Sequence, residues 1–452
     1  MQYVKQTPWI RFCLFHPAFR RKNIFSRVIT GHFKWYTADM PGLGNYLLTR
    51  DSLNLVRKLL DCFPCVVIIG ARQVGKSTFL KQILPCASSY DLEDYDDFHL
   101  IDGNPEFFLS QVTTPVIIDE AQLSPNLFKA LRVAIDKDRK TNGKFLLSGS
   151  SSPHLLKNIS ESLAGRVAIV ELAGLSWSEA LEKEESDFIE NIFCVNQLQK
   201  LTTTKTRKEL LELCLYGSYP EPYLNRRDTV RYYKWQENYI KTYIERDIRA
   251  LFPRLNLEAY RRLISMLAFS TGEIINLTKL SSSLGVSAST VAQYLEIIEG
   301  TFLWRKLKPY ETNLKKRLIK SAKGYIRDTG LINYFLKIQT LDQLQGHPNY
   351  GHIWEIFVIE QIFKSLANKS NYLYDVYFYR TKHKAEIDLV IETSNGLIPI
   401  EIKSSMELKT DSTKSIKSFI EEYQCPHGII ISNSEKIQMR SERVIEIPAI
   451  YL

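Results

Sequence analysis

The residues of this chain that are best suited to do chemistry form a glycine-rich loop, which matches the pattern G-x-x-x-x-G-K-[ST] at each constrained position. The loop consists of Gly70, Ala71, Arg72, Gln73, Val74, Gly75, Lys76 and Ser77, and Thr78 follows it. Glycines let the backbone wrap so that its N–H groups point at phosphate oxygens, while Lys76 reaches the terminal phosphates and Ser77 offers a hydroxyl to Mg²⁺. The loop predicts nucleotide binding, with ATP and Mg²⁺ as the expected ligands.

Two adjacent acids, Asp119 and Glu120, follow the apolar residues 116–118. We expect Asp119 to hold Mg²⁺ through water, and Glu120 to orient and deprotonate the water that attacks the γ-phosphate. Alone, such a pair is equally typical of a strand that runs into a solvated turn, but downstream of a complete phosphate loop the catalytic interpretation is favoured. Ser148 ends a third apolar run, where it either reads the γ-phosphate or caps a turn.

The elements that must position these groups can also be predicted. Residues 65–69 form an apolar run typical of a buried strand, and residues 78–84 continue as a helix, so strand, loop and helix come in the required order. Residues 88–92 predict another strand before an acidic loop, and an inserted strand is typical of ATPases with an additional catalytic glutamate. The predicted fold class is α/β, with a parallel sheet in a P-loop ATPase domain.

A second candidate site lies near the C-terminus, on two predicted strands. Residues 386–391 and 398–403 alternate between apolar and polar side chains and are joined by a turn at residues 394–396. Hairpin pairing would bring Asp388 and Glu401 together, and the period of two places Lys403 on the same side as Glu401. Clustered carboxylates bind Mg²⁺ or Mn²⁺, and the lysine would stabilise developing negative charge at a scissile phosphate.

Further groups could complete this C-terminal site. Glu355 lies in a mostly apolar predicted helix, where a metal-ligand role is plausible for a lone acid, and Glu360 is the competing candidate. Arg380 and Lys382 precede the hairpin and could contact a substrate backbone. The alternative is a solvated hairpin with a Glu-Lys pair, because short strand motifs are degenerate.

The middle of the chain predicts a DNA-binding module. Residues 277–286 and 287–295 form a helix, glycine turn and helix pattern, with Ser287 as the cap of the second helix. Ser289, Thr290 and Gln293 would lie on its outer side, and residues 302–307 would form a wing strand. Clustered positive charge follows at Lys308, Lys315, Lys316, Arg317, Lys320 and Lys323. This winged-helix pattern indicates DNA as a partner; its alternative is an interdomain packing unit.

The segments GARQVGKST, VIIDEAQ, FLLSGSS, SLAGR and YIERD resemble, in this order, a family of bacterial and archaeal AAA-type ATPases with a C-terminal domain of unknown function. The resemblance extends from about Leu59 to the C-terminus. It implies that Arg166 or Arg246 acts on a neighbour's γ-phosphate as an arginine finger, which requires a homo-oligomer; the alternative is an intrachain salt bridge. It also covers residues 323–331, without indicating a role for them.

The C-terminal pattern resembles the PD-(D/E)xK nuclease superfamily. The strand acid of that motif corresponds to Asp388, and its paired motif to Glu401 and Lys403. The chain departs from the pattern at Pro399, which replaces the usual acid just before the second strand. The resemblance implies a restriction-endonuclease-like domain, in which Glu355, Asp388 and Glu401 hold Mg²⁺ or Mn²⁺.

The overall composition sets wider limits. A chain of 452 residues is too long for one core, and its net charge of +9 is compatible with a polyanionic partner. No apolar stretch is long enough to cross a membrane, and seven scattered cysteines indicate a reducing compartment, the cytoplasm. We divide the chain into a basic extension (1–40), an ATPase core (41–178), a helical lid (179–252), a winged helix (253–340) and a nuclease-like domain (341–452).

The sequence thus predicts a Mg²⁺-dependent ATPase that is coupled to DNA binding and to metal-dependent cleavage by its C-terminal domain. A nucleotide-gated DNA-binding or signalling switch with an inactive nuclease-like domain is the alternative. Cleavage of DNA by the C-terminal carboxylates would discriminate between the two predictions.

Overall fold

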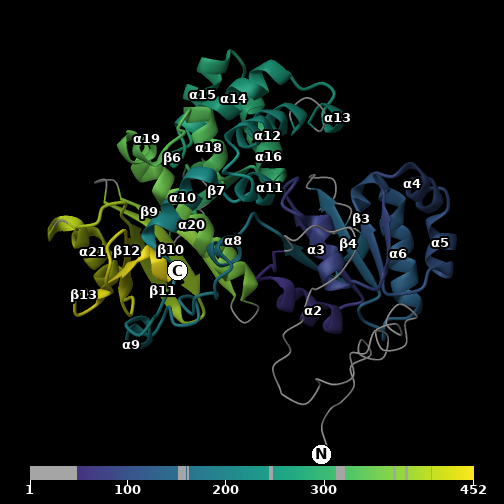
Figure 1. Ribbon diagram of the computed structural model, residues 1–452, viewed down its shortest axis with the longest axis horizontal. Coiled ribbons are helices and arrows are strands. Elements are labelled where there is room, and N and C mark those ends of the chain that lie inside the picture. Colours follow the sequence, from purple (N-terminus) through teal and green to yellow (C-terminus); the bar gives the residue numbers. More distant parts are fainter. Residues whose placement is uncertain are drawn as a thin grey trace, which may run out of the picture.

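The structure is a computed structural model, and it describes residues 48–150, 159, 162–243, 248–311, 321–369, 373–381, 385–408 and 410–452. Figure 1 shows three regions: the N-terminal α/β domain at the right, a mostly helical region at the top and a sheet-containing C-terminal domain at the left. The basic extension (1–40), Arg246 and Lys382 lie outside the described residues, as do the four basic residues between 315 and 320. None of the described helices is long and apolar enough to cross a membrane.

The N-terminal domain alternates helices and strands. Its elements are α2 (Leu53–Cys62), β1 (Cys65–Gly70), α3 (Lys76–Ile83), β2 (Ser88–Asp91), α4 (Tyr95–Asp102), α5 (Pro105–Gln111), β3 (Val116–Asp119), the 3₁₀ helix η2 (Ala121–Leu123), α6 (Pro125–Lys137), β4 (Phe145–Ser150) and β5 (Val167–Glu171). The strands form a parallel sheet in the order β2-β3-β4-β1-β5. Strands β1 and β3 are buried along their whole length, as expected for a parallel sheet covered by helices on both faces.

This strand order confirms the predicted α/β fold with a parallel sheet and corrects one detail. The predicted strand at residues 88–92 is present as β2, but it lies at the edge of the sheet beside β3. The strand that separates β1 from β3 in space is β4, which carries Ser148. The sequence order of strands does not determine their spatial order, because crossover connections can skip a position.

The middle of the chain is mainly helical. Its elements are α8 (Trp177–Leu181), α9 (Val195–Leu198), α10 (Arg207–Tyr216), α11 (Pro220–Leu224), α12 (Thr229–Thr242), α13 (Arg249–Leu251), α14 (Leu257–Phe269), β6 (Glu273–Ile274), α15 (Leu277–Leu284), α16 (Ala288–Gly300), β7 (Trp304–Pro309), β8 (Lys323–Ile326), α18 (Thr329–Leu336) and α19 (Leu341–Gly346). Gly285 ends α15 with a φ of 69°, and the Ser287 side chain accepts a hydrogen bond from the Thr290 N–H at the start of α16. The predicted helix, turn and helix are therefore present.

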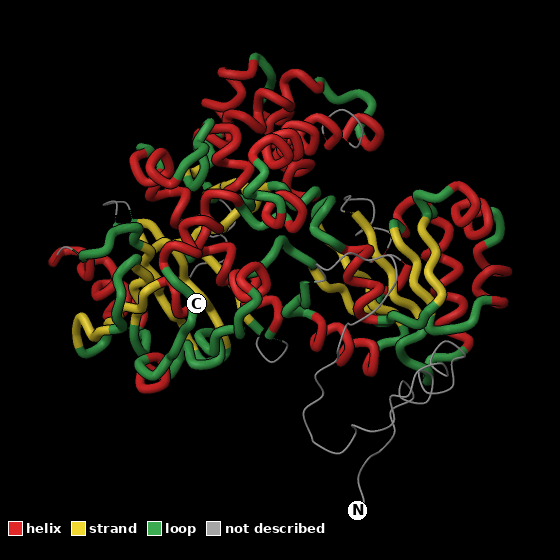
Figure 2. The backbone as a smooth tube through the Cα atoms, in the orientation of Figure 1, coloured by secondary structure: helices red, strands yellow, loops and turns green. Residues whose placement is uncertain are grey.

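The C-terminal domain begins with a long helix. Its elements are α20 (Tyr350–Asn368), β9 (Tyr374–Arg380), β10 (Glu386–Thr393), β11 (Gly396–Ile402), η4 (Thr410–Thr413), α21 (Lys414–Tyr423), β12 (Gly428–Ser432), β13 (Gln438–Ser441), β14 (Val444–Pro448) and η5 (Ala449–Tyr451). Strands β9, β10 and β11 are antiparallel neighbours, whereas β12 pairs with β11 in parallel. Figure 2 shows these strands on the side of the molecule opposite the N-terminal sheet.

The middle and C-terminal regions share one sheet. Strand β7 pairs in parallel with β9, with Lys308 opposite Tyr377, and the described strands follow the order β13-β14-β12-β11-β10-β9-β7-β8-β6. A continuous apolar core also joins the regions, since it extends from Val56 in α2 to Leu452. Within it, the rings of Trp177 and Phe357 stack with centroids 4.8 Å apart, which packs α8 against α20. The regions are therefore packed together as one body.

Candidate functional site

The glycine-rich loop connects β1 to α3 with a conformation that its glycines permit. Gly75 precedes α3 with a φ of 93°, in the left-handed region that favours glycine. At Gly70 a Cβ atom would lie 2.3 Å from the carbonyl oxygen of Leu172, which leaves no space for a side chain. The loop is thereby held against the segment that follows β5.

Lys76 opens α3 and is buried. Its Nζ donates hydrogen bonds to the carbonyl oxygens of Gly70 (3.2 Å) and Ala71 (3.0 Å), so the loop wraps around the ammonium group. Burial lowers the pKa of Lys76, while Glu120 and Asp119 oppose that change. Ser77 and Thr78 are exposed in the first turn of the helix, with their hydroxyls accessible to a ligand. These are the groups that a nucleotide phosphate and Mg²⁺ require.

Arg50, which no sequence pattern identified, binds backbone carbonyls of the phosphate loop and of the segment after β5. Its guanidinium donates to the carbonyl oxygens of Val74 (2.9 Å) and Ala173 (2.6 Å), and its Nε lies 3.0 Å from Glu179. Arg50 is 6 % exposed. Its contact with the loop spans 24 positions of sequence, so no local motif could have identified it.

Asp119 and Glu120 lie where β3 ends, beside the loop lysine. The Ser148 hydroxyl donates to Asp119 Oδ1 and accepts a 3.3 Å hydrogen bond from the Glu120 N–H. Glu120 has a φ of 51°, a left-handed conformation that costs a non-glycine residue about 1–2 kcal/mol. Its N–H also donates to Asp119 Oδ1 at 3.0 Å, so this conformation is held by two hydrogen-bond acceptors.

The Glu120 carboxylate is held in its ionised form. Burial alone would raise its pKa, but the Lys76 ammonium and hydrogen bonds from Gln122 and Ser150 outweigh burial and lower the pKa. The Gln122 side chain donates to Glu120 Oε2, and the Ser150 N–H donates to the same oxygen at 3.2 Å. Gln122 was not predicted as a site residue, although its position two residues after Glu120 is a usable signal.

Two arginines of the N-terminal domain with predicted roles make ion pairs within the chain. Arg72 in the loop lies 2.7 Å from Glu93, and Arg166 Nε lies 2.8 Å from Asp136. Arg166 directly precedes β5, whose first residue is aligned with Cys65, the first residue of β1. Arg166 therefore lies at the amino-terminal end of the parallel strands, whereas the phosphate loop of its own chain follows the carboxyl-terminal end of β1. An action on a neighbouring copy stays a prediction.

In the C-terminal domain the structure brings together the predicted acids. Leu389 is paired with Ile400, so Asp388 and Glu401 are each one residue beyond that pair. Asp388 Oδ2 accepts a 2.7 Å hydrogen bond from the Ile402 N–H, and Lys403 Nζ lies 2.5 Å from Glu401 Oε1. Asp388, Glu401 and Glu355 are each no more than 9 % exposed.

A lysine that was not predicted for this site lies within it. Lys323 Nζ is 3.0 Å from Glu355 Oε1 and 2.5 Å from Glu386 Oε1. Burial would lower the Lys323 pKa, but Glu355, Asp388 and Glu386 together raise it above its ordinary value. We call Glu355, Glu386, Asp388, Glu401, Lys323 and Lys403 the carboxylate cluster.

The carboxylates of the cluster influence one another. Burial, followed by the charges of Glu355 and Glu401, raises the pKa of Asp388 well above its usual value. Burial would also raise the pKa of Glu355, but His352 and Lys323 outweigh it and lower that pKa. The three predicted metal ligands thus lie within electrostatic reach of one another. As arranged here, however, the described residues contain no group of three or more His, Cys, Asp or Glu that could hold a metal ion.

Glu360, the competing candidate, has a different environment. Its carboxylate lies 2.6 Å from Arg305 and 3.2 Å from Arg327. Burial would raise its pKa, but the two arginines outweigh burial and lower the pKa to about 2. Glu360 is therefore a partner of arginines. Arg380 lies at the border of the cluster, with its Nε 3.9 Å from Glu386.

Family comparisons divide the chain into three matched segments. The model described as AAA domain matches residues 63–181, a domain of unknown function (DUF8612) matches residues 207–342, and another (DUF4143) matches residues 350–450. The uncharacterized protein Rv2008c of Mycobacterium tuberculosis is 33% identical over 403 residues, which are 88% of this chain and 83% of that protein. The chain belongs to the same family. The AAA domain match supports ATP binding and hydrolysis by this family member.

More distant similarities cover smaller shares of the chain. The uncharacterized protein MJ1544 of Methanocaldococcus jannaschii is 24% identical over 379 residues, 78% of this chain and 77% of that protein. Among solved structures, a Walker-type ATPase of Pyrococcus abyssi is 17% identical, with a TM-score of 0.43, and covers 64% of this chain and 96% of its own. The RuvB Holliday junction branch migration motor of Thermotoga maritima is 14% identical with a TM-score of 0.28, covering 57% of this chain and 90% of its own.

Proposed function

We propose that this chain is a Mg²⁺-dependent ATPase whose nucleotide cycle controls a DNA-binding middle region and a DNA-cleaving carboxylate cluster. The observation that carries this coupling is the position of Arg327. This arginine directly follows β8 and contacts Glu171, the last residue of β5, as well as Glu360 in α20. One side chain thus connects the ATPase sheet with the C-terminal domain.

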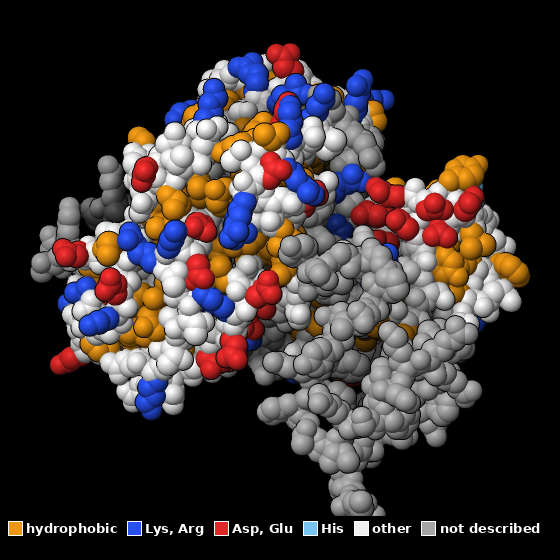
Figure 3. Space-filling view, in the orientation of Figure 1, with side chains coloured by type: hydrophobic (Ala, Val, Ile, Leu, Met, Phe, Trp, Pro, Cys, Tyr) orange, Lys and Arg blue, Asp and Glu red, His pale blue; other side chains and the backbone are white. Residues whose placement is uncertain are grey.

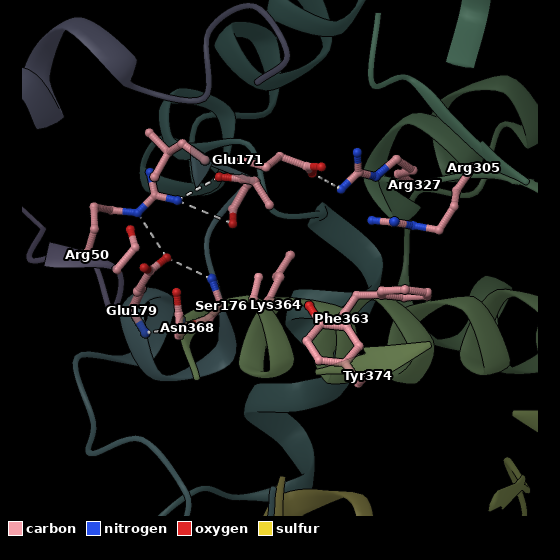
Figure 4. Close-up of a pocket in the computed structure, with 15 residues that line it drawn as sticks. Arg50, Glu171, Ser176, Glu179, Arg305, Arg327, Phe363, Lys364, Asn368 and Tyr374 are labelled. Atoms are coloured by element: carbon pink, nitrogen blue, oxygen red, sulfur yellow. Dashed lines mark hydrogen bonds and ion pairs between the residues drawn. The ribbon is translucent and has the colours of Figure 1, made fainter. Parts of the chain in front are cut away.

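Figure 4 shows the pocket at this junction, with Glu171 pointing toward Arg327 and Arg50 toward Glu179. The pocket is lined from both sides, by Arg50, Glu171 and Glu179 of the N-terminal part and by Arg305, Arg327 and Lys364. Arg50 also binds the phosphate loop through Val74. A nucleotide that moves the loop would therefore disturb the charges that hold the two halves together.

Two elements lead from this pocket to the carboxylate cluster. Helix α20 carries Glu360, which pairs with Arg327 of the pocket, and Glu355 in the cluster, a little more than one helical turn apart. Strand β8 begins with Lys323 in the cluster and leads directly into Arg327. A rigid shift of either element would move side chains both at the pocket and in the carboxylate cluster, which is the physical requirement for coupling.

Hydrolysis would use the groups beside the loop. Glu120 is ionised and hydrogen-bonded by Gln122 and Ser150, so it can accept a proton from an attacking water. Lys76 must leave the carbonyls of Gly70 and Ala71 to contact phosphate oxygens. Ser77 and Asp119 would hold Mg²⁺, which supplies charge neutralisation between the phosphates when bound.

DNA binding is supported by the helix pair α15–α16 and by the charge around it. Ser289 and Gln293 are exposed on α16, and α14 and α15 present the exposed cations Arg261, Arg262 and Lys279. Figure 3 shows Lys and Arg side chains gathered over this end of the molecule. Lys323 does not contribute, because it is 4 % exposed and paired with carboxylates. This corrects its predicted place on a phosphate-facing flank.

DNA cleavage is supported by the order of the helices and strands in the C-terminal domain, α20-β9-β10-β11-α21-β12, and by the acidic residues that these elements carry. Asp388 and Glu401 lie on neighbouring strands with Lys403, and Glu355 approaches from α20. A bound Mg²⁺ or Mn²⁺ would activate water and neutralise the scissile phosphate. Lys403, whose side chain is 35% exposed, would stabilise the charge that develops there.

A second candidate function is a nucleotide-gated switch whose C-terminal domain binds DNA without cutting it. The specific observation in its favour is Lys323, whose ammonium already compensates the carboxylates of Glu355 and Glu386. A metal ion is then not required to balance these charges.

Plasmid cleavage tests the proposal. Full-length protein is incubated with supercoiled DNA and Mn²⁺, with and without ATP, and binding to the same DNA is measured between 50 and 200 mM salt. We expect ATP-dependent nicking that Asp388→Ala and Lys403→Ala abolish, and affinity that falls steeply with salt. Lys417→Ala, an exposed lysine on α21, is the matched control. Cleavage that survives both site variants refutes the nuclease assignment, and DNA binding without any cleavage favours the switch.

A further inference from the structure

Lys323 has a position that neither ATP hydrolysis nor DNA binding explains. It is the first residue of β8, which belongs to the middle region, yet its side chain lies in the cluster of the C-terminal domain. The Phe378 ring covers it, with Nζ 5.6 Å from the ring centroid. A long flexible side chain is thus ordered and removed from water, at a cost that only strong charge pairing offsets.

The charges of the cluster are not balanced by its lysines. Four carboxylates, Glu355, Glu386, Asp388 and Glu401, face the two ammonium groups of Lys323 and Lys403. At the border of the cluster, Arg380 lies 3.9 Å from Glu386 and His352 lies 3.7 Å from Glu355. Glu401 is only 8 % exposed, and its Oε2 atom is buried without a hydrogen-bond partner. A buried carboxylate oxygen that lacks a donor indicates a place for a further cation.

Lys323 compensates two other carboxylates of the cluster in this conformation. Its ammonium contacts Glu355 and Glu386, and the charge of Asp388 stabilises it as well. This explains why predicted ligands lie together while the described residues contain no group arranged to hold a metal. An ammonium ion and a divalent cation cannot both be close to Glu355 and Asp388 without strong repulsion.

We propose that Lys323 is the resident cation of the carboxylate cluster, and that Mg²⁺ or Mn²⁺ enters only by displacing it. The inference rests on the proposed function, in which these carboxylates take a divalent cation. The backbone of β8 packs closely against β7, since a Cβ atom at Gly324 would lie 2.0 Å from the Trp304 ring. Displacement therefore requires rotation of the Lys323 side chain or a shift of the whole strand.

Direct metal binding tests the displacement. Mn²⁺ is titrated into the nucleotide-free full chain, and free Mn²⁺ is counted by electron paramagnetic resonance, so that no catalytic readout is involved. Lys323→Met is expected to bind Mn²⁺ at least tenfold more tightly than the natural chain, and Asp388→Asn added to it should remove the gain. Lys306→Met is the matched control, since Lys306 is exposed on β7 opposite Gly324.

Thermal melting checks that each variant is folded, and Lys323→Gln, which keeps a hydrogen-bond donor without the charge, must give the same gain. Equal or weaker Mn²⁺ binding by folded Lys323 variants overturns the displacement while leaving a metal site in place. If the natural chain and every variant fail to bind Mn²⁺, the displacement and the metal-dependent part of the proposed function are both refuted.

Discussion

At the scale of single residues, the phosphate-loop site contains side chains with distinct tasks. Lys76 is a cation that donates hydrogen bonds to backbone carbonyls, whereas Glu120 is held by Gln122, Ser150 and its own strained backbone. Binding and hydrolysis can therefore be separated by substitution.

Lys76→Ala should abolish detectable ATP binding, because it removes the cation that reaches the phosphates. Glu120→Gln should leave the ATP dissociation constant within about threefold and lower kcat by about 10²–10⁴-fold, the usual contribution of a general base. Fluorescent-nucleotide titration and phosphate release measure the two effects. Unchanged turnover in Glu120→Gln would remove that residue from its assigned role.

The residues that the sequence identified are those that lie in short local patterns. The loop residues, Asp119 and Glu120 could be found because a strand end places adjacent residues at one edge of a sheet. Asp388 and Glu401 could be paired because strands have a period of two. Arg50 and Lys323 could not be found, because their partners Val74 and Glu355 are 24 and 32 positions away in sequence.

At the scale of elements, the packing of β8 depends on a close approach between its backbone and the ring of Trp304. Gly324 is buried, and an added Cβ atom would lie 2.0 Å from the six-membered ring of Trp304 on β7. Trp304 is itself 1 % exposed and has no room to withdraw.

Gly324→Ala should destabilise the protein by about 1–3 kcal/mol or more, the typical cost of overpacking a core. Gly351→Ala is the matched control, since nothing lies within 4 Å of its Cβ position in α20, and there the helix should gain about 0.5–1 kcal/mol. Denaturant unfolding of both variants measures the difference. Equal stability of the two would show that β8 can move away from β7 at little cost.

The sequence predicted the helices and strands themselves better than it predicted which strands lie side by side. The hairpin register of β10 and β11 follows from their alternation and short turn. The place of β2 at the sheet edge and the pairing of β7 with β9 do not, because both depend on contacts between distant segments. Periodicity determines which face of a strand is buried, but not which strand lies beside it.

At the scale of the whole molecule, the contact of Arg327 with Glu171 and Glu360 predicts how nucleotide state reaches the C-terminal domain. In the natural chain, an ATP analogue should change the hydrogen exchange of amides in β8 and α20. Arg327→Gln should reduce that change by at least half and leave nucleotide affinity within about threefold, since the loop itself is untouched.

Arg231→Gln provides the control for this experiment, because Arg231 makes an exposed ion pair with Glu221 and such pairs contribute little to stability. Exchange in α20 that responds to nucleotide equally in all three proteins would exclude the Arg327 contact as the route of coupling.

The pairing of β7 with β9 has a practical consequence for anyone who wishes to separate this protein into pieces. The DUF4143 match begins at residue 350, but a fragment cut there would lose β7, the hydrogen-bonding neighbour of β9. Tyr377 and Phe378, both buried in the intact chain, would then lie on an open edge strand. Such edges recruit other chains, so the isolated fragment should aggregate, whereas a fragment that begins before α14 keeps β7, β8 and β6 beside β9.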